Sequence, residues 1–164
     1  MREGQPRAQH FLRPEVARRF VDRAGVGSSD LVLDLGAGTG ALTFLLAARA
    51  ERVVAVERDP KLARRLTRRV PPNVSVHQRD IADLWLPRRP FRVVANLPFA
   101  GSNDIVRRLL ARGVPLVRAD LIVEVGMARR WAERSRRCEV VCTLPASSFV
   151  PPPSCTAAVL RIRR

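Results

Sequence analysis

The chain has 164 residues, which predicts a single domain with room for a catalytic core and little else. Thirty basic residues against fifteen acidic ones give a formal net charge of +15 at pH 7, far more than solubility requires, so we expect a polyanionic partner such as a nucleic acid. The sequence has neither an apolar signal core nor a membrane-length stretch, and its three cysteines lack metal-ligand spacing, so we expect a cytoplasmic protein that binds no metal.

Strands and helices alternate along the chain. In chain order, the apolar patterns predict a helix at residues 14–24, a strand at 31–35, a helix at 41–50, a strand at 53–56, a helix at 60–70, strands at 74–77 and 91–95, a helix at 103–111, a strand at 121–125, a helix at 127–136 and a closing pair of strands at 139–144 and 156–162. This alternation predicts an α/β fold of the doubly wound, Rossmann-like type, with seven strands in a mostly parallel sheet and helices on both faces.

A glycine-rich loop follows the first predicted strand. Asp34 lies near the end of that strand, and Gly36, Gly38 and Gly40 come directly before the next predicted helix. Glycines at a strand-to-helix turn let backbone amides approach a ligand closely. Several kinds of nucleotide-binding sheet use such a loop, so the loop alone predicts a nucleotide-like ligand without saying which one.

Acidic residues end the next two strands. Glu57 ends the second strand, where a carboxylate can bind both hydroxyls of an adenosine ribose. Asp80 follows the third strand and is placed to accept a hydrogen bond from an adenine amino group. Each of the two could instead cap the helix that follows it. The ordered series of Asp34, the glycine loop, Glu57, Asp80 and Asn96 favours a cofactor site.

NAD and S-adenosylmethionine both fit a strand, loop and helix with a ribose-binding acid. Three features favour S-adenosylmethionine. The loop is Gly-x-Gly-x-Gly rather than the full Gly-x-Gly-x-x-Gly dinucleotide fingerprint. The chain contains no tyrosine, which excludes a Tyr-x-x-x-Lys pair for hydride chemistry. The segment at residues 96–99 also suits a methyl acceptor.

The tetrad Asn96-Leu97-Pro98-Phe99 ends the fourth predicted strand, at the edge of the sheet where ligands bind. The Asn96 side chain and the Leu97 carbonyl, which the following proline frees, can both accept hydrogen bonds from an exocyclic amino group. The Phe99 ring can stack on the base that carries this amine. The tetrad therefore predicts a site that presents a nucleobase amine to an electrophile, although Asn and Pro are also common in ordinary turns.

Together these motifs resemble the ribosomal RNA adenine N6-methyltransferases of the Erm and KsgA/Dim families, over nearly the whole chain. The resemblance implies a class I S-adenosylmethionine-dependent methyltransferase fold. It implies that Asn96, Leu97, Pro98 and Phe99 are catalytic, and that Phe99 and Phe149 hold the target base. It also implies that the cofactor is bound by Gln9, His10, Leu12, Asp34, Gly36, Gly38, Gly40, Glu57, Arg58, Asp80, Ile81 and Asn96.

Two departures from the family pattern bear on function. His10 replaces the asparagine of the family's Gln-Asn-Phe-Leu segment, which closes over the methionine part of the cofactor. The family's helical C-terminal domain does not follow the last predicted strand. We therefore expect one catalytic domain over residues 1–164, without a C-terminal RNA-binding domain, that acts as a monomer. Its own basic surface or a partner would then dock the RNA.

The implied reaction is direct displacement, in which adenine N6 attacks the sulfonium methyl group and S-adenosylhomocysteine leaves. No general base is required, since the proton can leave after transfer, and we do not expect His10 or His77 to be catalytic. The Erm branch, favoured by Phe99, implies an adenine of 23S rRNA and macrolide-type antibiotic resistance. The open alternatives are a KsgA-like 16S rRNA enzyme, a DNA adenine methyltransferase and a non-catalytic RNA-binding relative.

Overall fold

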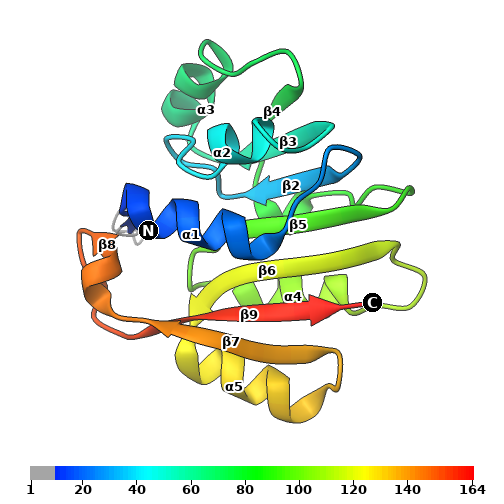
Figure 1. The fold of residues 1–164 in the computed structure, drawn as a ribbon, viewed down its shortest axis with the longest axis vertical. Coiled ribbons are helices and arrows are strands. Elements are labelled where there is room, and N and C mark those ends of the chain that lie inside the picture. The colour runs from blue at the N-terminus through cyan, green and yellow to red at the C-terminus, as the bar shows by residue number, and fades with distance from the viewer. Residues whose placement is uncertain (1–9) are drawn as a thin grey trace, which may run out of the picture.

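A seven-stranded sheet forms the centre of the computed structural model, which describes residues 10–164 (Figure 1). Its strands lie in the order β4 (Val74–Gln78), β3 (Arg52–Glu57), β2 (Leu31–Leu35), β5 (Phe91–Asn96), β6 (Leu116–Glu124), β9 (Ala157–Arg163) and β7 (Cys138–Leu144). The first five strands run parallel, whereas β9 is antiparallel to both of its neighbours. This topology confirms the mostly parallel α/β sheet and the closing antiparallel pair that the sequence predicts.

Helices cover both faces of the sheet (Figure 1). The first face buries α1 (Pro14–Ala24) and α2 (Thr43–Ala47), and the second buries α4 (Ser102–Leu109) and α5 (Val125–Arg134). Helix α3 (Pro60–Thr67) packs over the β3–β4 edge. Because successive strand residues point to opposite faces, the apolar strands feed a separate core on each face, and a third, smaller cluster joins β3 to α3 through Ala55 and Leu66. Within residues 10–164, no helix has the length and apolar character needed to cross a membrane.

The helix boundaries follow local signals in the sequence. Helix α1 begins at Pro14, where a missing N–H costs nothing, and it ends before Gly25, which has a φ of +60°. The Asp59 side chain caps α3 by accepting from two backbone N–H groups of its first turn. Helix α2 is shorter than the predicted 41–50, because turns form on either side of it. The apolar run there predicts burial but carries no cap that would mark the helix ends.

Two parts of the fold differ from the sequence-based expectation. Strand β6 begins at Leu116 rather than at residue 121, because two charged side chains that interrupt its apolar pattern are paired within the sheet. A small antiparallel ribbon of β1 (Phe11–Leu12) and β8 (Phe149–Val150) is not predicted at all. This ribbon joins the amino-terminal segment to the proline-rich segment that precedes β9.

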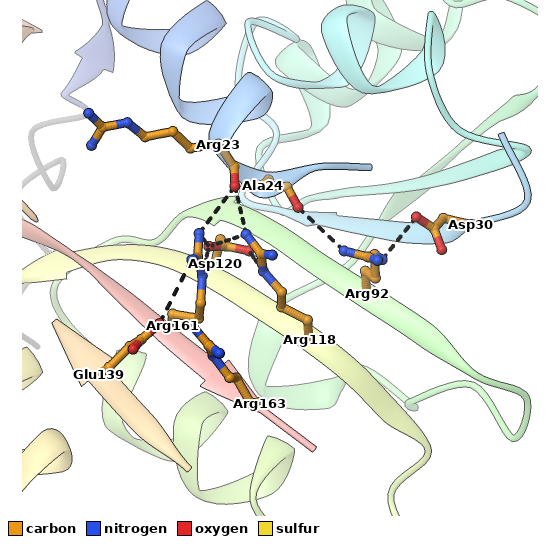
Figure 2. A network of polar contacts seen from close by, with 9 residues as sticks. All are labelled: Arg23, Ala24, Asp30, Arg92, Arg118, Asp120, Glu139, Arg161 and Arg163. Atoms are coloured by element: carbon orange, nitrogen blue, oxygen red, sulfur yellow. Dashed lines mark hydrogen bonds and ion pairs between the residues drawn. The ribbon is translucent and has the colours of Figure 1, made fainter. Parts of the chain in front are cut away.

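An arginine network anchors α1 to the sheet at the end opposite the glycine loop (Figure 2). Asp120 is 2% exposed, and its two carboxylate oxygens accept hydrogen bonds from Arg118 Nε at 2.7 Å and Arg161 Nε at 2.8 Å. Both guanidinium groups also donate to the Arg23 carbonyl, in the last turn of α1. Terminal helix carbonyls lack partners within the helix, so these contacts satisfy one of them and also complement the helix dipole.

We expect Asp120→Ala to destabilise the fold by about 3–5 kcal/mol, because it leaves two largely buried guanidinium groups without their carboxylate. Urea denaturation would measure the loss. Asp104→Ala is the matched control: it removes a pair with Arg107 whose two side chains are exposed, and should cost about 1 kcal/mol or less. Equal losses in the two variants would contradict the anchoring role of the network.

Candidate active site

The polar residues singled out in the sequence meet at one edge of the sheet. Asp34, Glu57 and Asn96 lie at the carboxyl ends of β2, β3 and β5, and Asp80 follows β4 closely. Because these four strands are parallel neighbours, their carboxyl ends share an edge. Ligands of open α/β sheets bind at this edge.

The glycine loop between β2 and α2 adopts a conformation that only glycine tolerates well. Gly36, Gly38 and Gly40 all have positive φ values, of 79°, 58° and 93°. Space is restricted as well as conformation: a Cβ on Gly38 would lie 3.1 Å from Phe11 Cε1, and one on Gly40 would lie 2.6 Å from Leu66 Cδ1. The loop is tied to β3, since the N–H groups of residues 36 and 37 both donate to the Val56 carbonyl, at 2.8 and 3.0 Å.

Glu57 fixes the same loop through its side chain. The residue is 5% exposed, and its Oε2 accepts from the Gly38 N–H at 2.8 Å while its Oε1 accepts from the Asp59 N–H at 2.8 Å. The helix-capping alternative for Glu57 is excluded, because Asp59 caps α3. Each carboxylate oxygen can accept more than one hydrogen bond. Glu57 therefore retains acceptor capacity for a pair of ligand hydroxyls beside the glycine amides.

Asp34 lies beneath this surface rather than on it. The residue is 1% exposed, and its Oδ2 accepts a hydrogen bond from the Thr43 hydroxyl at 2.6 Å, which ties α2 to β2. Burial raises the pKa of Asp34 to about 7; the Thr43 hydrogen bond opposes this shift, and the nearby Glu57 charge adds to it. Asp34 thus supports the loop from within the fold.

Asp80 both caps a turn and forms an ion pair. Its Oδ1 accepts from the Ala82 N–H at 2.9 Å, at the start of the short 3-10 helix η1 (Ile81–Asp83), and its Oδ2 lies 3.7 Å from Arg58 Nη1. The capping alternative considered for Asp80 is therefore present in the structure. About half of the Asp80 side chain remains exposed, so it can still contact a ligand. Ile81 lies close to the glycine loop, since its Cδ1 is 3.8 Å from the position of a Cβ on Gly36.

The tetrad lies directly against the glycine loop. A Cβ on Gly36 would lie 3.6 Å from both the Asn96 carbonyl oxygen and Pro98 Cδ. Leu97 is buried and its N–H donates to the Ile122 carbonyl at 3.1 Å, whereas Pro98 is exposed. Asn96 Nδ2 donates to the His10 carbonyl at 3.0 Å.

That last contact fixes the orientation of the Asn96 amide. A carbonyl can only accept, so the amide must turn its NH2 group toward His10 and its Oδ1 away. Among residues 10–164, neither Asn96 Oδ1 nor the Leu97 carbonyl accepts a hydrogen bond. Two adjacent acceptors are therefore available beside the glycine loop, as an exocyclic amine would require.

The aromatic residues are arranged differently from the expectation. Phe99 is partly buried and its ring faces that of His10. Phe149 was expected to hold the target base, but it is 1% exposed and packs in the core shared with α1, opposite Leu12 in the ribbon. The structure does not bring Phe149 to the exposed edge of the site, and Leu12 is buried with it. Gln9 lies outside the described residues.

His10 was expected to bind the cofactor and not to be catalytic, and its contacts with the tetrad were not predicted. Its ring and its backbone carbonyl contact the tetrad at Phe99 and Asn96, and its Nδ1 contacts Pro151. Its place beside Phe11 and Leu12 was the only available signal, and the β1–β8 pairing that brings these segments together is not visible in the sequence pattern.

The residues present fit an adenosine-containing cofactor. The three positive-φ glycines form a turn without side chains, which a ligand can approach closely, and a buried carboxylate with spare acceptor capacity lies beside it. Within residues 10–164, no group of three His, Cys, Asp or Glu side chains is arranged to hold a metal ion. The site is therefore suited to bind a nucleoside through hydrogen bonds and to direct an amine toward it.

Comparisons with known proteins lead to the same chemistry. The chain matches the family model "Ribosomal RNA adenine dimethylase" over residues 6–164. An rRNA adenine N-6-methyltransferase of Bacillus licheniformis is 33% identical, over 95% of this chain and 60% of the relative. The ribosomal RNA small subunit methyltransferase A of Acidobacterium capsulatum is 34% identical, over 93% of this chain and 62% of the relative. The chain thus spans about 60% of the length of these curated relatives.

A solved structure shares the fold closely. The crystal structure of the 23S rRNA methyltransferase ErmE superposes with a TM-score of 0.85 at 28% identity, over 94% of this chain and 69% of that one. This likeness confirms the expected Rossmann-like class I methyltransferase fold, with its seven-stranded sheet.

The raised pKa of Asp34 predicts a pH-dependent stability. The folded chain keeps the Asp34 proton up to about pH 7, whereas the unfolded chain loses it near pH 4, so ionisation destabilises the fold as pH rises through this range. Asn at this position can still accept the Thr43 hydroxyl but does not ionise. Between pH 4 and pH 8, the free energy of unfolding of the wild type should fall by a few kcal/mol relative to that of Asp34→Asn.

Urea denaturation across this pH range would test the prediction, with the exposed Asp83→Asn as the matched control. The control should follow the wild-type curve. Parallel curves for the wild type and Asp34→Asn would show that Asp34 is ionised in the folded chain like an ordinary carboxylate.

Proposed function

Since this chain belongs to the ribosomal RNA adenine dimethylase family, we propose that it transfers a methyl group from S-adenosylmethionine to N6 of an adenine in ribosomal RNA. One observation carries the proposal: the His10 carbonyl turns the Asn96 amide so that Oδ1 and the Leu97 carbonyl are both available beside the glycine loop. An adenine amino group has two hydrogens to donate, and these two acceptors match them.

The tetrad would act by positioning the amine. Bound S-adenosylmethionine supplies an electrophilic methyl group on its sulfonium sulfur. The lone pair of an aromatic amine is delocalised into the ring, which makes N6 a poor nucleophile. Hydrogen bonds from N6 to Asn96 Oδ1 and the Leu97 carbonyl would hold the amine in line and favour the pyramidal geometry that frees its lone pair. Phe99 would stack on the extruded base.

The cofactor would be held by the residues around the glycine loop. Glu57 would accept the ribose hydroxyls, and the glycine turn of residues 36–40, which carries few side chains, would lie against the nucleoside. Asp80 and Ile81, beside Arg58, would contact the adenine ring. The amino-terminal segment with Gln9, His10 and Leu12 would close over the methionine part, as the family resemblance implies.

For the target, we favour an adenine of 23S rRNA, which would make the protein a determinant of macrolide-type antibiotic resistance. The likeness to ErmE and the phenylalanine at position 99 support this choice. A small-subunit target is the second candidate, because the Acidobacterium capsulatum relative, named for that subunit, matches at 34% identity. In either case the enzyme would act in the cytoplasm, where ribosomal RNA resides.

The charge of the chain supports an RNA substrate. Five basic side chains on and just after α3 line an open groove of about 420 Å³, and no acidic residue is among them: Lys61, Arg64, Arg65, Arg68 and Arg69. Phosphate groups complement such a surface, and Arg binds them bidentately. We therefore propose that the catalytic domain contributes directly to docking the RNA. We also propose that it acts as a monomer.

The proposed function is tested by transfer of labelled methyl from S-adenosylmethionine to 23S rRNA, 16S rRNA and duplex DNA in parallel, with reverse-transcription stops to map the product. We expect label at one adenine of 23S rRNA. Label in 16S rRNA or in DNA would replace the proposed target with one of the alternatives. Tight cofactor binding without transfer to any of the three would contradict the enzyme assignment for the chain acting alone.

Asn96→Ala should lower the rate of transfer by about 10²–10³-fold or more, because it removes an acceptor placed for the reacting amine. The Kd for S-adenosylmethionine, measured by calorimetry, should change little. Asn103→Ala is the matched control, since the Asn103 side chain instead accepts from Trp131 Nε1 on α5. A variant Asn96→Ala that loses cofactor binding in proportion to its activity would refute the role given to this amide.

A further inference from the structure

The ring of His10 is held in place facing the ring of Phe99. The two centroids are 6.3 Å apart and the planes differ by 26°. His10 Nδ1 lies 2.8 Å from the Pro151 carbonyl, and because a carbonyl can only accept, Nδ1 must carry the proton and donate it. The pairing of Phe11 with Val150 in the ribbon anchors the next residue of the same segment. The imidazole is therefore fixed by contacts on two sides.

The distance between the His10 and Phe99 ring centroids is close to the separation that two flat groups need to hold one base between them. Stacked bases lie about 3.4 Å apart, so one base between two rings requires a separation of roughly 6.8 Å. The observed centroid distance of 6.3 Å, which is an upper limit on the gap between the two rings, is slightly smaller. A small opening of the ribbon, together with alignment of the two planes, would admit a purine.

We propose that His10 forms the second wall of the pocket for the target adenine, with the base stacked between its imidazole and the Phe99 ring. This inference rests on the proposed function and refines it. It replaces Phe149, which is too deeply buried to reach a base at this edge. His10 would also help to orient the reacting amine. Its backbone carbonyl accepts from Asn96 Nδ2, which turns Asn96 Oδ1 the other way and leaves that oxygen available.

The inference predicts that the ring of His10, rather than its hydrogen bond, governs RNA substrate use. His10→Ala should lower kcat/KM for RNA by about 5–150-fold, the usual effect of removing an aromatic platform beneath a base. His10→Phe should restore most of that loss, since it keeps a flat ring but gives up the bond to Pro151. His10→Asn should behave like His10→Ala, because it can donate to Pro151 but has no ring.

Two controls separate this role from a structural one. The thermal midpoint of unfolding should be similar in all three variants, whereas a merely structural role would lower it, and any change in the Kd for S-adenosylmethionine should not follow the presence or absence of the ring. His77→Ala, which changes the other histidine of the chain at an exposed position of β4, should leave transfer unchanged. The inference is overturned if His10→Asn is as active as His10→Phe, or if His10→Ala matches or exceeds the wild type.

A second readout does not depend on methyl transfer. A single-stranded oligonucleotide with one 2-aminopurine, mixed with the chain and S-adenosylhomocysteine, reports stacking through quenching of its fluorescence. Weaker quenching by His10→Ala, which keeps only Phe99, than by the wild type and His10→Phe supports the wall. This holds even if no RNA is methylated, in which case only the proposed function fails. Equal quenching by the wild type and His10→Ala refutes the wall and leaves the proposed function standing.

Discussion

The geometry of the site depends on the hydrogen bonds that join the glycine loop to β3. Gly36 and Ala37 donate to the Val56 carbonyl, and Gly38 donates to the Glu57 carboxylate. These bonds require the positive-φ turns that glycine allows. They also hold the loop beside Asn96 and Pro98, so that a Cβ on Gly36 would be in van der Waals contact with both residues. A single loop therefore sets the distance between the glycine turn and the two available acceptors of the tetrad.

Stability and available acceptors lie at different places on the sheet. On the face that α1 covers, shown in Figure 2, arginines and carboxylates pair near the middle of β6 and β9 and bind the end of α1. At the carboxyl ends of the parallel strands, Asn96 Oδ1 and the Leu97 carbonyl accept no hydrogen bond from residues 10–164, so both remain available beside the glycine loop.

The sequence predicted the sheet because apolar strands and glycine turns are local signals, and it placed Asp34, Glu57, Asp80 and Asn96 at one edge because parallel strands share their ends. It could not predict which groups point outward. Phe149 and His10 illustrate this: the ribbon of β1 and β8 joins segments far apart in the chain, buries Phe149 and brings His10 to Phe99. Likewise, the predicted strand at 121–125 began too late, because the sequence does not show that Arg118 and Asp120 are paired within the sheet with Arg161.

The proposed chemistry requires that this edge of the sheet directs the exocyclic amine of an adenine, and no other atom, toward the methyl group. Mass spectrometry of the nucleosides of ribosomal RNA treated with the chain and S-adenosylmethionine would test this requirement. We expect N6-methyladenosine or N6,N6-dimethyladenosine as the sole new nucleoside. A methyl group on a ring nitrogen of adenine, or on any other base, would contradict the role assigned to Asn96 and Leu97.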